Sequence, residues 1–493
     1  MEQLLALVPI LVLLAGMIGL GWSAAQAGMA AAVVAIMLAI TTFAYGIGYL
    51  ALSGPLLEAL FTAATILWIV FPALALYEFQ TRSGAADRMG AWLATVSGKR
   101  EVLALILAWF FALLLEGAAG FGTPVALVAP MLVALGFSPH RSLLLALIGH
   151  AAAVSFGAVG TPMVPLLGAY SGDAARLSGQ IMMMHAALGW LLAGLVFHLA
   201  RPTGFGVWMA APVAAALYLV PALMLAWLTG PELPALGGAL IGGALFIAFA
   251  RWRWPAGSGV QPITTREALD AVLPYILVLA IILATRTIPA ISAALQSVTI
   301  EWNIAGRFGG AVAPLYHPGT MLLVALACTC LAKRGNRAVF GPSLGAAAAR
   351  LPSVALALVS VLLLARVMVH SGMIADLANG AVGLLGPYWA LAVPLTGALG
   401  SFITGSATAS NILLADFQIA AAGASTINPV SALVGQGFGA AIGNVIAPHN
   451  VVAGAATVGL VGREGAILKV TLPVCMVYAG LGGMMLYFGP AIG

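Results

Sequence analysis

Two short runs of glycine, proline and hydroxyl residues interrupt otherwise apolar stretches of this 493-residue chain. They are residues 116–124, Glu-Gly-Ala-Ala-Gly-Phe-Gly-Thr-Pro, and residues 404–411, Thr-Gly-Ser-Ala-Thr-Ala-Ser-Asn. Glycine costs about 1 kcal/mol and proline about 3 kcal/mol in a helix interior, so we predict that each run is the tip of a re-entrant hairpin. The helix that starts after such a tip presents unpaired N–H groups and a positive dipole end, and both attract anions.

These runs therefore predict a binding site for an anion. Their glycines let a ligand approach the main chain, and their hydroxyl and amide groups can donate hydrogen bonds to a carboxylate. The predicted binding residues are Gly117, Gly120, Gly122, Thr123, Gly405, Ser406, Thr408, Ser410 and Asn411. The alternative is that the glycines only allow helices to pack closely. Binding is favoured because polar residues accompany the glycines in both runs.

A second pair of helix breaks is predicted at residues 157–162, Gly-Ala-Val-Gly-Thr-Pro, and residues 443–450, Gly-Asn-Val-Ile-Ala-Pro-His-Asn. Each proline removes a backbone donor and leaves carbonyl groups unpaired. Non-helical backbone inside a membrane is tolerated only where it is buried in protein or lines a wet cavity. We therefore add Thr161, Asn444 and Asn450 to the predicted binding residues.

Three ionisable residues adjoin these breaks. Glu116 ends an apolar run at the first tip, where a carboxyl group shielded from water can exchange a proton near neutral pH. It is our first candidate for proton coupling, and a structural ion pair is the alternative. His449 lies in one of the later breaks and His150 just precedes the other, so each is either a proton relay or a hydrogen-bonded packing residue.

The elements that must position these residues are membrane helices. The chain is 62% hydrophobic and 7% charged, whereas a soluble domain has roughly 25% charged residues. Residues 4–22, 207–228, 268–285 and 467–488 are each long enough to cross a bilayer as a helix. Residues 4–22 lack the basic flank of a signal peptide, so we expect the first membrane helix there. We predict an all-α polytopic membrane protein with about 12–14 transmembrane helices.

The basic residues predict which loops face the cytoplasm. They are Arg82, Arg88, Lys99, Arg100, Arg251, Arg253, Arg266, Lys333, Arg334, Arg337, Arg350, Arg463 and Lys469. This pattern puts the N terminus in the periplasm. The net charge of +5 forms no long basic run, so we expect no nucleic-acid partner. The three cysteines lie in apolar stretches, which argues against a zinc site, and we expect no metal or cofactor.

The chain also matches itself. Residues 82–84 align with 370–372, and residues 116–120 align with 404–408, at one offset of about 288 positions. We predict N-terminal helices at 1–54, a first repeat at 55–170, connecting helices at 171–342, a second repeat at 343–458 and a C-terminal helix at 459–493. Chance similarity between apolar segments is the alternative, and the conserved order of several matches argues against it.

The charges of equivalent loops indicate that the repeats are inverted. Residues 82–100 hold four lysines or arginines, whereas the equivalent residues 370–389 hold none. Inverted repeats are typical of alternating-access carriers, which bind substrate near the middle of the membrane where the copies meet. We therefore expect a secondary transporter with its site at the four breaks.

Three motifs support this interpretation. Residues 115–122 (Leu-Glu-Gly-Ala-Ala-Gly-Phe-Gly), 402–411 and 459–464 (Gly-Leu-Val-Gly-Arg-Glu) resemble the lactate permease family of bacteria, and the likeness spans nearly the whole chain. The resemblance implies proton-coupled uptake of L-lactate, D-lactate or glycolate across the inner membrane, and an elevator-like architecture. The chain departs from the family at Ala407, where the family has an acidic residue, and at residues 447–450, which replace a Ser-Pro-Gln-Ser type run.

Two alternatives to a proton symporter belong to different classes. The first is a carrier of another small organic anion driven by Na⁺, which unwound backbone can coordinate. The second is a membrane-embedded enzyme that uses Glu116 with a histidine as acid and base, but the chain lacks the usual catalytic motifs. The partners we expect are a small organic monocarboxylate, protons and the lipid bilayer, and assembly into a homo-oligomer is left open.

Overall fold

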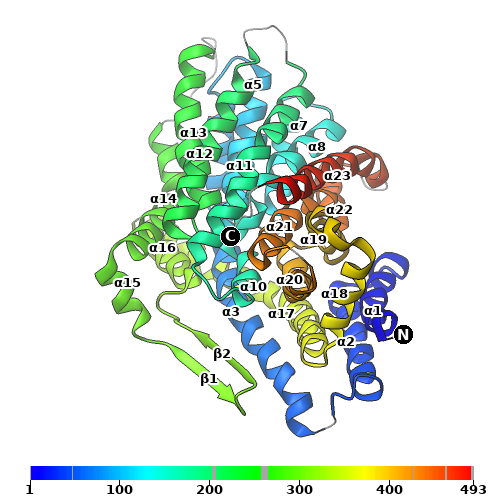
Figure 1. Cartoon of the computed structure of the whole chain (residues 1–493). Coiled ribbons are helices and arrows are strands. Elements are labelled where there is room, and N and C mark those ends of the chain that lie inside the picture. The colour runs from blue at the N-terminus through cyan, green and yellow to red at the C-terminus, as the bar shows by residue number, and fades with distance from the viewer. Residues whose placement is uncertain are drawn as a thin grey trace.

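The chain forms a bundle of helices with one small β-hairpin (Figure 1). The structure is a computed structural model that describes residues 2–46, 48–120, 122–202, 207–256, 265–332, 334–425, 427–460 and 463–489. Within these residues, eleven helices are long and apolar enough to cross a membrane, and several shorter apolar helices accompany them. The predicted helical, polytopic architecture is confirmed.

The N-terminal part contains two helices and then a first series of helices. The two are α1 (Glu2–Leu14) and α2 (Ala24–Thr41). The series comprises α3 (Tyr49–Arg82), α4 (Ala85–Ala94), α5 (Arg100–Ala104), the π-helical Leu105–Phe111, α6 (Ala112–Ala118), α7 (Thr123–Ala134), α8 (Pro139–Gly149), the 3₁₀ turn Ala151–Phe156, α9 (Gly157–Gly160) and α10 (Met163–Gly168). Helix α1 is shorter than the expected span 4–22, because the chain widens into the π-helical Ala15–Gly19 and turns at Gly21, whose φ is +67°.

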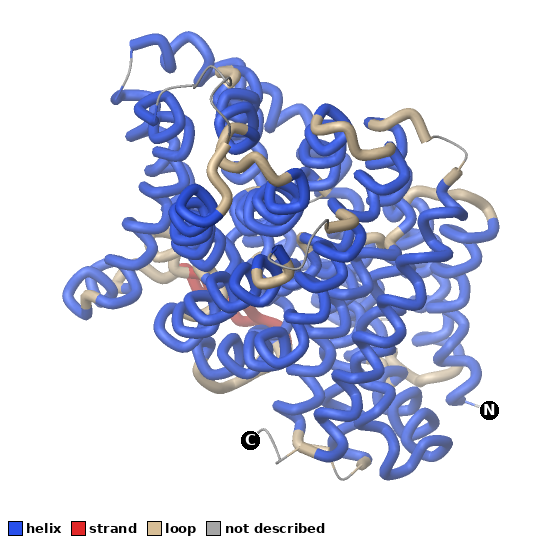
Figure 2. Tube along the Cα trace, turned by 90° about the horizontal axis from the view of Figure 1, so that it is seen from above, coloured by secondary structure: helices blue, strands red, loops and turns tan. Residues whose placement is uncertain are grey.

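The middle part holds the long connecting helices and the hairpin. Its elements are α11 (Ala174–Leu199), α12 (Ala210–Thr229), α13 (Pro234–Arg253), α14 (Thr265–Thr287), α15 (Pro289–Gln296), β1 (Ile300–Ile304), β2 (Phe308–Val312) and α16 (Pro318–Ala332). The strands pair antiparallel, with Trp302 opposite Gly310. Figure 2 shows helices across the whole width of the molecule, with the strands confined to one small region.

The last part repeats the order of elements seen in the first series. It comprises α17 (Arg334–His370), α18 (Met373–Leu385), the 3₁₀ turn Gly386–Tyr388, α19 (Trp389–Thr404), α20 (Ala407–Ala424), α21 (Pro429–Gly443), the 3₁₀ turn Asn444–Ile446, α22 (Pro448–Thr457) and α23 (Glu464–Phe488). Gly84 and Gly372, which precede α4 and α18, both have left-handed backbone, with φ of +66° and +85°. The shared order fits two repeats, and their inverted orientation stays a prediction.

Close helix packing brings the two series together. Helix α3 lies along α17, and α19 packs against α21 and α23. Glycines make several crossings tight: a Cβ at Gly149 would collide with the carbonyl of Ala108, and one at Gly439 with the carbonyl of Pro394. Some of the glycines therefore serve packing between membrane helices, as small residues commonly do.

Candidate functional site

All four predicted breaks border one cavity of about 190 Å³, here called the central cavity. Its wall comprises Glu116, Gly120 and Gly122 from the first hairpin, Val154, Gly157, Ala158, Thr161 and Pro162 from the break after α8, Gly405, Ser406, Ala407 and Thr408 from the second hairpin, and Asn444 from the break after α21. Pockets for drug-sized ligands occupy roughly 300 to 1,000 Å³, so this cavity suits a smaller molecule.

Each hairpin turns at glycines that hold left-handed backbone. Between α6 and α7, Gly120 and Gly122 have φ of +59° and +74°, and between α19 and α20, Gly405 has φ of +74°. Glycine adopts this conformation without the steric cost that a Cβ brings. The first turns of α7 and α20 therefore begin at the central cavity, with their positive dipole ends beside it. In α20 the Ser406 hydroxyl already accepts a hydrogen bond from the Ala409 amide.

The break after α8 holds strained backbone against the same cavity. Ala158 and Val159 have φ of +42° and +53°, which is rare for residues with a Cβ and rarest for a β-branched one. Such conformations cost about 1 to 3 kcal/mol each and cluster at functional sites. The Thr161 hydroxyl donates to the Ala158 carbonyl at 2.7 Å, which fixes the turn. The helices are interrupted here as the glycine and proline pattern predicts.

Glu116 is the sole carboxylic acid among the described residues that line the central cavity. It is 5% exposed, and its Oε1 atom lies so close to Gly157 that a Cβ there would overlap it. No ion pair to Glu116 is present among the described residues. The structural ion pair that we weighed for this carboxylate is therefore not seen in this part of the chain.

His150 reaches the central cavity through an amide chain. Its Nδ1 lies 2.8 Å from the Ala146 carbonyl, and its Nε2 lies 3.3 Å from Oδ1 of Asn444, which lines the cavity. The Asn450 amide donates to Asn444 in turn, and the Oδ1 of Asn450 is buried without a hydrogen bond. Asn450 lies behind Asn444, close to Gly122. These hydrogen bonds join His150 to the break after α21.

Four of the described residues that we predicted to bind the ligand lie outside the cavity wall: Asn450, which lies behind Asn444, and Asn411, Ser410 and Gly117. The Asn411 amide donates to the Pro162 carbonyl at 2.9 Å, and the Ser410 hydroxyl donates to the Gly397 carbonyl at 2.9 Å. Both side chains also accept from Nε2 of Gln436, at 3.2 Å each, so their hydrogen-bonding groups are already used inside the protein. Gly117 packs instead against α13, where a Cβ would lie 2.5 Å from the Leu236 nitrogen.

The sequence analysis overlooked two buried polar residues, and two of its predicted site residues have side chains outside the described part of the structure. It missed Gln436, a fully buried amide in α21 that links α20 to the core; an isolated polar residue in an apolar span was the available signal. It also missed His185, whose ring nitrogens lie 2.9 Å from the Ser155 hydroxyl and 3.2 Å from the Tyr478 hydroxyl. The side chains of Thr123 and His449 lie outside the described residues, so their predicted roles stay predictions.

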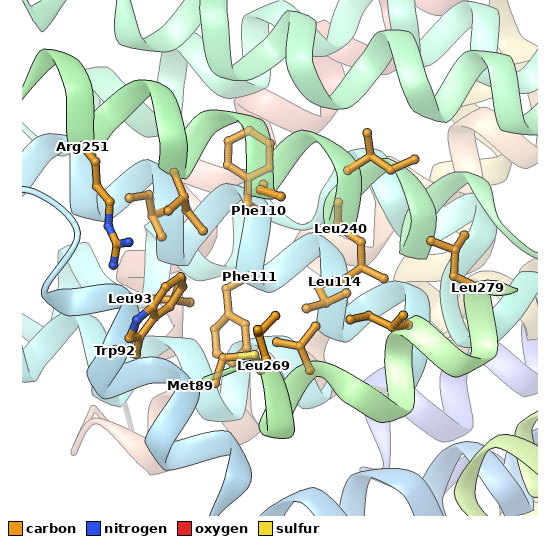
Figure 3. A pocket seen from close by; sticks show the side chains of 18 residues that line it. Met89, Trp92, Leu93, Phe110, Phe111, Leu114, Leu240, Arg251, Leu269 and Leu279 are labelled. Carbon is orange, nitrogen blue, oxygen red and sulfur yellow. The ribbon is translucent and has the colours of Figure 1, made fainter. Parts of the chain in front are cut away.

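A larger pocket elsewhere is chemically unsuited to an anion. It has a volume of about 520 Å³ between α4, the π-helical segment, α13 and α14, and Figure 3 shows its apolar lining, including Phe110, Phe111, Leu114 and Leu240. Arg251 lies at one end, with its guanidinium 4.8 Å from the Trp92 ring. Among the residues that line this pocket, Arg251 is the single charged one, so the wall lacks the array of donors that a carboxylate needs.

Comparison with known proteins points consistently to one family. The model of the family described as L-lactate permease matches residues 2–490. An L-lactate permease of Streptococcus iniae is 32% identical over 381 residues, which are 74% of this chain and 79% of that protein. An L-lactate permease of Bacillus subtilis is 26% identical over 96% of this chain and 93% of its own length. A glycolate permease of Escherichia coli is 26% identical over 98% of this chain and 95% of its own.

Two solved structures share the overall fold. The YdaH transporter of Alcanivorax borkumensis superposes with a TM-score of 0.52 at 14% identity, over 95% of this chain and 99% of that one. MtrF of Neisseria gonorrhoeae superposes with a TM-score of 0.51 at 14% identity, over 96% of each chain. At this identity the likeness concerns the fold alone.

Proposed function

The chain belongs to the L-lactate permease family, and from this premise we propose that it carries a small 2-hydroxymonocarboxylate, such as lactate or glycolate, in symport with protons. It is a multi-pass membrane protein of the bacterial inner membrane. We further propose that substrate binds in the central cavity and that the hairpins and breaks act as two inverted repeats around it.

The convergence of the four breaks on one small cavity supports this proposal. A carboxylate placed there meets the N-terminal ends of α7 and α20, together with the hydroxyl of Thr408. Helix N-termini stabilise anions by their unpaired N–H groups and by the helix dipole. A substrate of two or three carbon atoms requires a small cavity with exposed main chain and few polar side chains, and the central cavity has these features.

Glu116 is our candidate for proton coupling. An acid that couples transport must be protonated with substrate on one side of the membrane and deprotonated on the other. A buried carboxyl group beside the binding cavity, with no cationic partner in the described residues, can adopt both the protonated and the deprotonated state. The family's other acidic position is Ala407 here, so Glu116 carries this role without a second carboxylate in the described wall.

The substitution Glu116→Gln tests the coupling. It imitates the permanently protonated acid, so the variant should still exchange labelled lactate between equal pools in proteoliposomes. It should fail to accumulate lactate when an inward proton gradient is imposed. Glu101→Gln is a matched control, because Glu101 lies on the same membrane span, is also 5% exposed and does not line the central cavity. Wild-type accumulation by Glu116→Gln would contradict its role and direct attention to His150 and His449.

A further inference from the structure

A second polar cavity of about 580 Å³ lies beneath the β-hairpin, and we call it the hairpin cavity. Strand β2 forms one wall, and α3, α10, α17 and α20 contribute the others. The hairpin is docked firmly there: the Gly309 amide donates to Glu58 at 3.3 Å, and Phe61 packs edge-on against Trp302. In Figure 1 the hairpin extends beside α3 and α15, away from α5 and α7.

Three polar atoms at the wall of the hairpin cavity are buried without partners. They are Nη1 of Arg286, Oε2 of Glu232 and Nδ1 of His317, none of which has a hydrogen bond within the described residues. The Arg286 side chain is only 5% exposed. Leaving such groups unpaired is costly in a folded protein, so buried polar atoms of this kind normally bind a water or a ligand.

The rest of the Arg286 guanidinium is already fixed. Its Nε and Nη2 donate to Oε1 of Glu232 at 3.1 and 2.9 Å, Nη2 also donates to the Tyr316 carbonyl, and the group lies 3.6 Å from the centre of the Tyr316 ring. Oε2 of Glu232 and Nη1 of Arg286 are therefore the remaining unpaired acceptor and donor of this pair. Both atoms are sealed from water, so a small side-chain shift must precede their contact with a ligand in the cavity. Burial and the adjacent Arg286 lower the pKa of His317 to about 4, so its ring is neutral at pH 7.

The other carboxylates in the hairpin cavity have partners. Glu58 contacts His370 at 2.7 Å, and Asp416 faces Arg366 at 3.9 Å. An incoming anion therefore meets no unpaired carboxylate other than the open side of Glu232. A 2-hydroxy acid matches that pair: its carboxylate accepts from Arg286 and from a neutral His317, and its hydroxyl donates to Glu232.

The hairpin cavity also adjoins the central cavity along two shared elements. On α20, Thr408 lines the central cavity, whereas Ile412 and Asp416 line the hairpin cavity. At α10, Pro162 lines the first and Pro165 the second. The hydrogen bond from Asn411 to the Pro162 carbonyl ties these two elements together at the boundary. A substrate could pass between the cavities once this contact opens.

We propose that the hairpin cavity is a second binding site for the 2-hydroxymonocarboxylate, formed by Arg286, Glu232 and His317, where substrate waits before it enters the central cavity. This inference rests on the proposed function, because the ligand is the transported substrate. A monocarboxylate without the hydroxyl group, such as propionate, leaves the Glu232 acceptor unsatisfied and should bind there more weakly.

The test measures the initial rate of labelled L-lactate uptake into proteoliposomes against lactate concentration. The double variant Glu232→Gln/Arg286→Gln removes both charges together, because removing one partner would leave the other buried and uncompensated. It should raise the KM roughly 10- to 100-fold, as expected for lost hydrogen bonds to charged groups, while the saturating rate stays within about two-fold. The matched control Glu78→Gln/Arg350→Gln removes an ion pair of 2.7 Å that lines neither cavity, and its KM should equal that of the wild type.

The variant His317→Leu decides the matter if the double variant does not fold, since no partner of Nδ1 is lost with it. It should raise the KM for lactate about 2- to 10-fold and leave the preference for lactate over propionate as competitor unchanged, because both acids carry the carboxylate that His317 contacts. An unchanged KM in these variants, with an active wild type, would overturn the second site and leave the proposed function intact. A wild-type protein that moves neither lactate nor glycolate under any gradient would instead overturn the proposed function and the ligand assigned here.

Discussion

At the scale of single residues, Thr408 and Asn411 differ although they lie one turn apart on α20. Thr408 lines the central cavity, whereas Asn411 holds the break by its bond to Pro162 and accepts from Gln436. Both are buried and polar. Ligand binding and structural support are therefore separable by substitution.

We predict that Thr408→Val weakens lactate binding by about 2- to 10-fold, because one neutral hydrogen bond is lost from the cavity. Thermal stability should change little, since valine keeps the shape of threonine. Isothermal titration or scintillation proximity binding on the purified protein measures the first quantity. Equal affinity in Thr408→Val and wild type would place the substrate away from α20.

We predict that Asn411→Leu instead destabilises the fold, by about 1 to 3 kcal/mol, because the Pro162 carbonyl loses its side-chain donor and Gln436 loses an acceptor. A lowered melting temperature in detergent would show this. The sequence alone predicts Asn411 as a binding residue, and in that interpretation the change would weaken ligand binding instead. A drop in affinity without any loss of stability would restore that first interpretation.

The difference between these two residues shows where sequence reasoning stops. Breaks at glycine and proline are predictable, because their cost in a helix is local. The direction of a side chain on the following helix depends on how that helix is rotated, and here on Gln436, which lies 25 residues from Asn411. The same limit hid the pair of Glu232 and Arg286, which are 54 residues apart.

At the scale of elements, the break after α8 packs directly against the end of α6. Gly157 has ordinary extended backbone, with φ of −63° and ψ of 155°, so its lack of a side chain matters for space and not for conformation. The space is taken by the Glu116 carboxylate. A methyl group here would push the acid away from its place beside the central cavity.

We predict that Gly157→Ala lowers gradient-driven lactate uptake at least ten-fold, because a displaced acid no longer faces the substrate. Folding should survive, since the obstructed atom is the far end of a flexible side chain. Gly194→Ala in α11 is the matched control, because a Cβ there meets no atom within 4 Å and the residue lines neither cavity. Its uptake should equal that of the wild type. Normal uptake by Gly157→Ala would show that the position of Glu116 is unimportant.

The sequence patterns did not predict every element of the structure. The β-hairpin of β1 and β2 was not expected, because its strands carry only five residues each and are held by contacts with α3 and α17. Arg307 donates to the His370 carbonyl, and Phe308 packs against the His370 ring. Contacts between segments so distant in sequence leave no local pattern to read.

At the scale of the whole molecule, two helical series with one order of elements enclose the central cavity. The family resemblance inferred from three motifs is confirmed by the match over residues 2–490. The inversion of the repeats rests on loop charges and stays a prediction. Inverted copies would give hairpins that enter from opposite faces, and alternating access then needs only a shift of one set of elements against the other.

Matched positions in the two series test the inversion. Asp87 in α4 and Ala375 in α18 are equivalent at the repeat offset, follow a left-handed glycine by three residues and are both exposed. We predict that, after replacement of Cys328, Cys330 and Cys475, a membrane-impermeant maleimide labels Ala375→Cys in intact cells. Asp87→Cys should be labelled only after the membrane is permeabilised, because the basic loop beside it faces the cytoplasm. Copies with the same orientation would instead give both cysteines the same accessibility, and the carrier would then need another source for its two-sided opening.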